Sequence, residues 1–159
     1  MNDLKRIVVI RIRGIAKSDR EVKDTLYLLR LRRNNLAVIT KNTPEIVGMI
    51  KKVEPWIAWG EIKKEIFKNL LLKRGRLVGN KRFSEEYLKK TLGISLDDFV
   101  NNFFDFKMEL EDIPGIKPYF RLKPPSGGYP RKGIKVNYKE GGAYGYWGEN
   151  INNLLASMI

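Results

Sequence analysis

The sequence predicts an α+β fold, a small sandwich related to the split βαβ, or ferredoxin-like, arrangement. Two observations support this class. Apolar patterns run in the order strand, helix, strand, helix within residues 7–55, and these pieces are too short for a doubly wound nucleotide-binding sheet. Neither a G-x-G-x-x-G nor a G-x-x-x-x-G-K-[ST] motif is present. With 159 residues and 43% apolar side chains, the chain can bury a core as one structural unit.

Residues 7–13 predict the first strand. Its second half alternates, with Ile10 and Ile12 on one face and Arg11 and Arg13 on the other. This period of two is typical of a half-buried strand. We therefore expect the two arginines to lie on an open, cationic face.

The next predicted element is a helix. Gly14 supplies a turn at low steric cost, and residues 18–21 (Ser-Asp-Arg-Glu) form a capping box with Ser18 as the N-cap. Asn34 and Asn35 are suited to a left-handed helix end. The last turn is then cationic, which the helix dipole favours, through Arg30, Arg32 and Arg33.

A second strand and helix follow. The run LAVIT at 36–40 is short and rich in β-branched residues, as in a buried strand. Thr43 precedes Pro44 and predicts an N-cap with proline in the first turn. Lys51 and Lys52 point away from the apolar stripe of this helix.

Residues 61–116 are predicted to be helical, with Ser84 and Ser95 as N-caps. Asp97 and Asp98 stand in the first turn after Ser95. Carboxylates at that place compensate the helix dipole, so this pair is interpreted as structural and not as a metal or acid/base site.

Charge indicates a polyanionic partner. The chain has 31 Lys and Arg against 18 Asp and Glu, a net charge of +13, and the surplus is interrupted by an acidic segment at 97–116. Histidine and cysteine are both absent, which removes the commonest metal ligand, thiolate metal sites and a Cys nucleophile. No run approaches 18 uninterrupted apolar residues, so no membrane span is expected.

Residues 118–123 predict a further strand, and residues 151–158 predict a short amphipathic helix that docks on the body. Between them, residues 126–150 are rich in glycine and aromatic residues. Flat rings can stack on bases and cations can neutralise phosphates, so we expect this tail to bind nucleic acid more than it supports folding. Its rings and cations are Tyr129, Tyr138, Tyr144, Tyr146 and Trp147 with Arg131, Lys132, Lys135 and Lys139.

Three blocks, in order, resemble one known family. They are TLYLLRLRRNNLAV at 25–38, residues 43–62, and FRLKPPSGGYPRKGIK at 120–135 with the later GG and INNLLASM. They are similar to the large-subunit ribosomal protein family L-thirty, in the long form called L-seven in eukaryotes. The long basic N-terminal extension of eukaryotic members is missing, which favours an archaeal source. The resemblance implies a β-α-β-α-β sandwich with a three-stranded antiparallel sheet, two helices on one face and a C-terminal addition.

The resemblance also implies a cytoplasmic, structural role in the large ribosomal subunit, bound to rRNA near the 5S rRNA and beside other ribosomal proteins. No cofactor, metal, membrane or small-molecule substrate is expected. Many relatives carry an Arg where this chain has Trp147, so stacking is expected there instead of a phosphate contact. The candidate RNA-binding residues are Arg11, Arg13, Gly14, Arg30, Arg32, Arg33, Thr43, Lys51, Lys52, Lys123, Tyr129, Arg131, Lys132, Lys135, Lys139, Tyr144, Tyr146 and Trp147.

The expected parts are an α+β core at 1–60, a helical extension at 61–116, and a returning strand, tail and terminal helix at 117–159. Two other functions stay open at this point. A small RNA-acting enzyme would use Arg11, Arg13 and Gly14 as a phosphate cradle, although no catalytic group is evident. A free nucleic-acid-binding regulator would use the middle helices, although the acidic segment would then meet phosphates.

Overall fold

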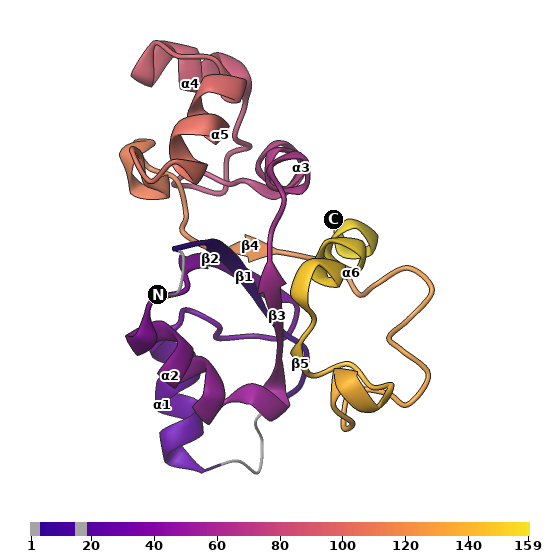
Figure 1. Cartoon of the computed structure of the whole chain (residues 1–159). Coiled ribbons are helices and arrows are strands. Elements are labelled where there is room, and N and C mark those ends of the chain that lie inside the picture. The colour runs from indigo at the N-terminus through magenta and orange to yellow at the C-terminus, as the bar shows by residue number, and fades with distance from the viewer. Residues whose placement is uncertain (1–3, 15–18) are drawn as a thin grey trace.

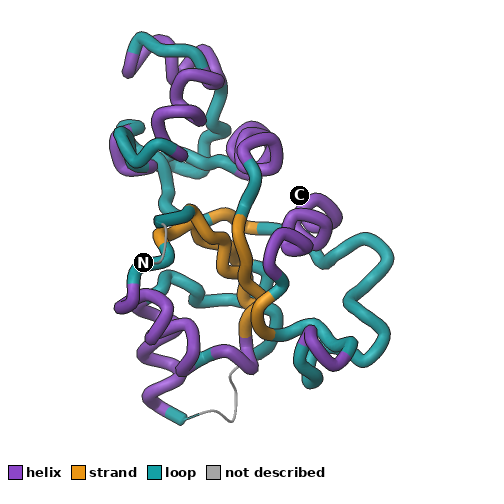
Figure 2. Tube along the Cα trace, viewed as in Figure 1, coloured by secondary structure: helices purple, strands orange, loops and turns teal. Residues whose placement is uncertain are grey.

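A computed structural model describes residues 4–14 and 19–159. Its centre is a five-stranded sheet in the order β4-β2-β1-β3-β5 (Figure 1, Figure 2). The strands are β1 (Arg6–Arg11), β2 (Leu36–Lys41), β3 (Ile57–Glu61), β4 (Phe120–Arg121) and β5 (Gly145–Tyr146). All pairs are antiparallel except β3 with β5.

The mixed α+β class is confirmed, but the expectation of a three-stranded sheet is wrong. The three longer strands form an antiparallel centre, and the C-terminal part of the chain adds one short strand at each edge. An open edge strand presents unpaired backbone N–H and C=O groups to solvent or to other chains. The two additions cover part of both edges.

Helices cover both faces of the sheet (Figure 1). α1 (Arg20–Leu28) and α2 (Pro44–Lys52) pack on one face, and α3 (Lys64–Arg74), α5 (Leu96–Phe104) and α6 (Ile151–Met158) lie on the other side. α4 (Glu85–Leu92) stands next to α5, at the far end from α1 and α2. Short 3-10 turns are η1 (Glu54–Trp56), η2 (Leu110–Asp112), η3 (Tyr138–Glu140) and η4 (Gly148–Asn150).

The two layers of helices change the environment of β1. Ile7 and Val9 pack against α1 and α2, while Val8 and Ile10 face the core that includes α3, α5 and α6. Every residue of β1 is buried, Arg11 included. The expectation that β1 is half-buried with an open cationic face is therefore wrong. Arg11 shares its face with Ile7 and Val9, which α1, α2 and the loop after α1 cover, and the C-terminal half of the chain covers the opposite face.

Three helices begin at the N-cap residues that the sequence predicts. The hydroxyl oxygens of Thr43, Ser84 and Ser95 accept hydrogen bonds from the third backbone N–H beyond each of them, at 3.4, 3.2 and 3.2 Å. Gly93 ends α4 in the left-handed conformation, at φ 70°. The capping side chains thus fix where α2, α4 and α5 begin.

α1 differs from its prediction at both ends. It begins at Arg20 with Asp19 in the N-cap position, one residue after the predicted cap Ser18, which lies outside the described residues. It ends at Leu28, so the expectation of three arginines in its last turn is wrong. The left-handed stop is Arg30, and Asn35, although left-handed, directly precedes β2.

α6 docks on the body as expected, with Leu154, Leu155 and Met158 buried. The approach is close at Gly60 of β3, where an added Cβ would lie 2.2 Å from the carbonyl oxygen of Gly148 and 2.9 Å from Ile151. Glycine is required at this position because the backbone of the C-terminal segment fills the space that a side chain would take.

A buried cation joins the sheet to the helical layer. The guanidinium of Arg6 donates to both carboxylate oxygens of Glu109, at 2.9 and 3.2 Å, and to two backbone carbonyls. It also lies 3.8 Å from the ring centroid of Phe103 and 4.5 Å from that of Phe106. Lys41 reaches the same carboxylate at 2.9 Å. One carboxylate of the acidic segment, that of Glu109, is therefore neutralised by cations of the sheet.

We predict that Arg6→Gln lowers the free energy of unfolding by about 2–4 kcal/mol, because it removes one partner of an ion pair whose Arg6 side chain is only 2% exposed. Denaturant unfolding measures the loss. Arg20→Gln is the control, since Arg20 is 93% exposed and its pair with Asp24 is long, at 3.8 Å; its effect should stay within about 0.5 kcal/mol. Equal effects from the two variants would contradict a central role for Arg6.

Candidate nucleic-acid interface

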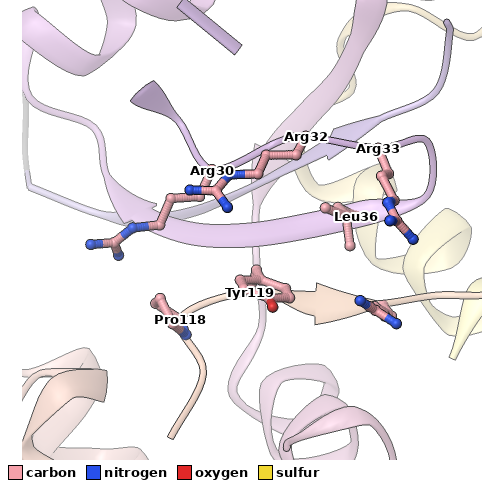
Figure 3. A pocket seen from close by; sticks show the side chains of 7 residues that line it. Arg30, Arg32, Arg33, Leu36, Pro118 and Tyr119 are labelled. Atoms are coloured by element: carbon pink, nitrogen blue, oxygen red, sulfur yellow. The ribbon is translucent and has the colours of Figure 1, made fainter. Parts of the chain in front are cut away.

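Four arginines surround one cavity of about 290 Å³ beside the edge of the sheet (Figure 3). Arg30, Arg32 and Arg33 come from the loop between α1 and β2, and Pro118 and Tyr119 lie across from them on the segment that leads into β4. We call this site the arginine groove. Its lining consists of Arg30, Arg32, Arg33, Leu36, Pro118, Tyr119 and Arg121.

The first wall of the arginine groove is a rigid helix end. The N–H of Arg30 donates to the carbonyl of Tyr27 at 2.9 Å, and the N–H of Leu31 donates to that of Leu26 at 2.8 Å. These two bonds make a Schellman motif, anchored by the fully buried Leu31. Arg30 holds the left-handed position at φ 64°, which normally favours glycine and costs an L side chain about 1–2 kcal/mol. The fold tolerates this strain at a residue of the groove.

The second wall is β4, which pairs with β2 so that Arg121 stands opposite Leu36 and Phe120 opposite Ala37. Phe120 is fully buried, and the alternation of the strand leaves Arg121 exposed beside it. Sequence reasoning identified this segment as a strand but assigned no ligand contact to Tyr119 or Arg121. The alternation of Phe120 and Leu122 with Arg121 is the sequence signal that indicates an exposed cation on this strand.

The charges of the arginine groove are not neutralised by the protein. Within the described part of the chain, none of its four arginines takes part in an ion pair. Arg32 lies 4.5 Å from the ring centroid of Tyr27, a cation–π contact that orients it without removing its charge. Guanidinium groups bind phosphate oxygens in a planar, bidentate geometry, and Tyr119 adds a ring that can stack. The groove is chemically suited to a phosphodiester backbone.

Arg11 does not join this group. Its side chain donates to the carbonyls of Arg13 and Leu31, both at 3.1 Å, and burial lowers the pKa of its guanidinium. Arg11 is 4% exposed, so the phosphate cradle of Arg11, Arg13 and Gly14 is not formed. Arg11 instead supports the loop that carries the arginine groove. Arg13 is half-buried, 5.9 Å from the ring centroid of Trp56, and Gly14 is exposed.

The aromatic tail packs on the protein. Trp147 is 9% exposed, its indole N–H donates to the carbonyl of Ala143 at 2.7 Å, and its ring stacks on Tyr138 at 4.3 Å. Tyr129 and Tyr144 are half-buried against the same core. The expectation that Trp147 is a free stacking ring is therefore wrong, because the glycines let the tail fold back closely enough to bury it.

Tyr146 is the most exposed of these rings, yet it too is engaged. Its hydroxyl donates to a carboxylate oxygen of Glu61 at 2.5 Å, and its ring lies 4.6 Å from that of Trp59. Desolvation, together with the Glu61 hydrogen bond and charge, raises the pKa of Tyr146 to about 12. The phenol stays neutral at physiological pH and joins β5 to β3.

The other predicted contacts are spread over the surface. Lys52 pairs with Glu21 at 3.2 Å, and the hydroxyl of Thr43 caps α2. None of the remaining predicted cations lines the arginine groove, and all of them are exposed or half-buried: Lys51, Lys123, Arg131, Lys132, Lys135 and Lys139. Of the candidate residues, Arg30, Arg32 and Arg33 line the arginine groove together, while Thr43 and Lys51 line a separate cavity at α2 and Arg11 lines another with Arg32.

Neither a metal site nor a membrane-spanning helix is found among the described residues. Over residues 4–14 and 19–159, no three His, Cys, Asp or Glu side chains gather closely enough to hold a metal ion. In the same part of the chain, every helix is too short or too polar to cross a membrane.

Comparison with known proteins gives a consistent result. The family model described as Ribosomal protein L30p/L7e matches residues 7–57. Archaeal proteins named large ribosomal subunit protein uL30 are similar over almost the whole chain. That of Methanopyrus kandleri is 42% identical over 93% of this chain and 100% of its own length. That of Nanoarchaeum equitans is 42% identical over 95% and 97%, and that of Thermofilum pendens 44% over 96% and 97%.

The packing of the tail predicts that Trp147→Ser destabilises the free protein. Losing a buried indole should lower the free energy of unfolding by about 3 kcal/mol, measured by denaturant unfolding. Tyr27→Ser is the matched aromatic control, because Tyr27 is 59% exposed; its effect should stay below about 1 kcal/mol. A stable Trp147→Ser protein would show that the tail is not a folded part of the body.

Proposed function

The chain belongs to the L30p/L7e family of ribosomal proteins, and from this membership we propose that it binds rRNA in the large ribosomal subunit and helps to hold the RNA domains around the 5S rRNA in place. The family is structural and not enzymatic, and its members work on the ribosome in the cytoplasm. Neighbouring ribosomal proteins are further partners.

The arginine groove carries the proposal. Four guanidinium groups without internal ion-pair partners among the described residues line one cavity with an aromatic ring. Binding of phosphates there releases counterions from the RNA, which is the main source of affinity in such interfaces. The helix end and β4 fix both walls before binding, so less side-chain and loop entropy is lost on association.

Two of the three parts of the chain form the arginine groove in this proposal. Residues 1–60 supply the loop of Arg30, Arg32 and Arg33, and residues 117–159 supply the opposite wall. Further phosphate contacts come from exposed or half-buried groups outside the groove. These are Arg13, Gly14, Lys51, Lys123, Arg131, Lys132, Lys135 and Lys139.

A second candidate, an RNA-acting enzyme, is not favoured. Its cradle depended on Arg11, whose guanidinium is turned inward onto two backbone carbonyls. A free regulator is also less suitable, because the chain matches the ribosomal proteins over nearly their whole length.

Arg30→Gly separates binding from folding. Glycine relieves the left-handed backbone, so the free energy of unfolding should stay constant or rise by up to about 1 kcal/mol. Affinity for rRNA extracted from large subunits should fall about tenfold, because a charge-assisted hydrogen bond is worth about 1.5–3 kcal/mol. Filter binding over a series of KCl concentrations measures both the affinity and its salt slope.

Lys89→Gln on α4 is the charge-matched control for this experiment, since Lys89 is exposed and lies outside the groove. It should retain nearly full affinity. Equal losses in the two variants would mean that net charge, and not the arginine groove, determines binding.

Proximity to the 5S rRNA needs a separate test. The chain has no cysteine, so Leu28→Cys, at an exposed residue near the groove, gives a single attachment point for an iron-EDTA probe. In reconstituted archaeal large subunits, hydroxyl radicals from this site should cleave the 5S rRNA and the adjoining large rRNA. The cysteine-free parent, treated identically, is the control. Cuts confined to the large rRNA would keep the rRNA-binding proposal and reject the 5S position.

A further inference from the structure

A second cationic element lies outside the arginine groove. The chain between α3 and α4 folds back on itself at residues 75–83, which we call the basic hairpin. Arg76 and Arg82 form an antiparallel bridge, and the N–H of Leu77 donates to the carbonyl of Lys81 at 2.7 Å. Gly79 and Asn80 make the turn with φ values of 80° and 61°.

The basic hairpin is tied to the body at several points. The N–H of Val78 donates to the carbonyl of Gly115 at 2.9 Å, and that of Lys117 donates to the carbonyl of Arg76 at 2.8 Å. Leu77 and Phe83 are buried in the larger core. These bonds and anchors hold the element in place before any ligand binds.

Most cations of this region have no ion-pair partner among the described residues, although the guanidinium of Arg76 donates to the backbone carbonyl of Gly75 at 3.0 Å. No acidic residue occurs between Glu65 and Glu85. Of the cations in this interval, only Lys68 makes an ion pair within the described residues, with Asp97. The others cluster on or beside the basic hairpin: Lys73, Arg74, Arg76, Lys81 and Arg82.

The bridge itself is unfavourable without an anion. Like charges directly opposite each other on antiparallel strands repel. The same protein shows how such a pair is relieved elsewhere: Arg6 and Lys41 are also cross-strand partners, and Glu109 lies between them. Among the described residues, Arg76 and Arg82 make no ion pair with a carboxylate, so an anion that relieves their repulsion would come from another molecule.

The tip adds an apolar surface. Val78 is 72% exposed and stands next to the cations of the basic hairpin. An apolar side chain beside arginines is suited to a ribose or base that lies next to a bound phosphate. An acidic protein surface would supply carboxylates for the arginines, but it fits an exposed apolar side chain such as Val78 less well than a nucleotide does.

We infer that the basic hairpin is a second rRNA-binding element, in which Arg76 and Arg82 hold one backbone phosphate and Val78 contacts the adjoining nucleotide. The inference rests on the proposed rRNA binding and deepens it. With two separate elements, the protein contacts the RNA at two places and not through the groove alone.

The test uses Arg82→Gln and the double variant Arg76→Gln with Arg82→Gln, in the full-length protein with rRNA extracted from large subunits. Affinity should fall about tenfold in the double variant, and the log–log salt slope should become shallower by about 0.7–0.9 for each phosphate that the variant no longer binds. The melting temperature of the free Arg82→Gln protein should not fall, because the substitution removes a repulsion and Arg82 makes no side-chain hydrogen bond among the described residues.

The matched control is Lys89→Gln with Lys90→Gln, which removes the same charge from exposed positions on α4. If the basic hairpin variants bind as this control does while Arg30→Gly is impaired, the inference fails and the proposed function stands. If the parent protein binds rRNA without a steep salt dependence, that result contradicts the proposed function itself and not only the inference about the basic hairpin.

A probe on Val78→Cys identifies the partner. Hydroxyl radicals generated there in reconstituted large subunits should cut rRNA. Cross-linking from this cysteine to a ribosomal protein, with no cuts in rRNA, would overturn the inference in favour of an acidic protein partner.

Discussion

The rest of the fold depends on how the protein places the buried charge of Arg6. This residue begins β1, and its side chain points into the helical layer on the far side from α1 and α2. A buried guanidinium without partners would cost several kcal/mol; its partners here are Glu109, the carbonyl of Phe103 at the end of α5 and the carbonyl of Met108 in the segment after it. Partial burial raises the pKa of Glu109, but hydrogen bonds from Arg6 and Lys41 outweigh this effect and lower it. The carboxylate thus stays charged to lower pH than usual and keeps the helical layer on the sheet.

This arrangement also separates the charges of the molecule. Three carboxylates of the acidic segment have partners within the protein: Glu109 binds Arg6 and Lys41, Asp97 binds Lys68, and Asp112 accepts from the N–H of Glu109. Acidic groups used in this way cannot neutralise the arginine groove or the basic hairpin. In a chain of net charge +13, the cations of the arginine groove and the basic hairpin therefore have no ion-pair partner among the described residues.

Local signals in the sequence predicted local structure well. The caps Thr43, Ser84 and Ser95 located three helices, because a cap is decided by residues three positions apart. Burial depended on distant segments and was harder to predict. Arg11 alternates with isoleucines as a surface residue would, yet it is buried beside the loop after α1, where its guanidinium donates to the carbonyl of Leu31. Trp147 lies in a glycine-rich stretch that folds back on the core. The opposite wall of the groove was missed because β4 is remote in sequence from the loop that it faces.

One strained position and one repulsive pair lie where the ligand is proposed to bind. Arg30 occupies a left-handed position that glycine would take more readily, and Arg76 faces Arg82 across a bridge. The extensive core and the Arg6 network can sustain such local costs. Binding of a polyanion to the folded state alone then stabilises that state by mass action and relieves the repulsion. A protein of the ribosome can therefore keep unfavourable cation geometry in its free form if, as proposed, rRNA supplies the missing anions.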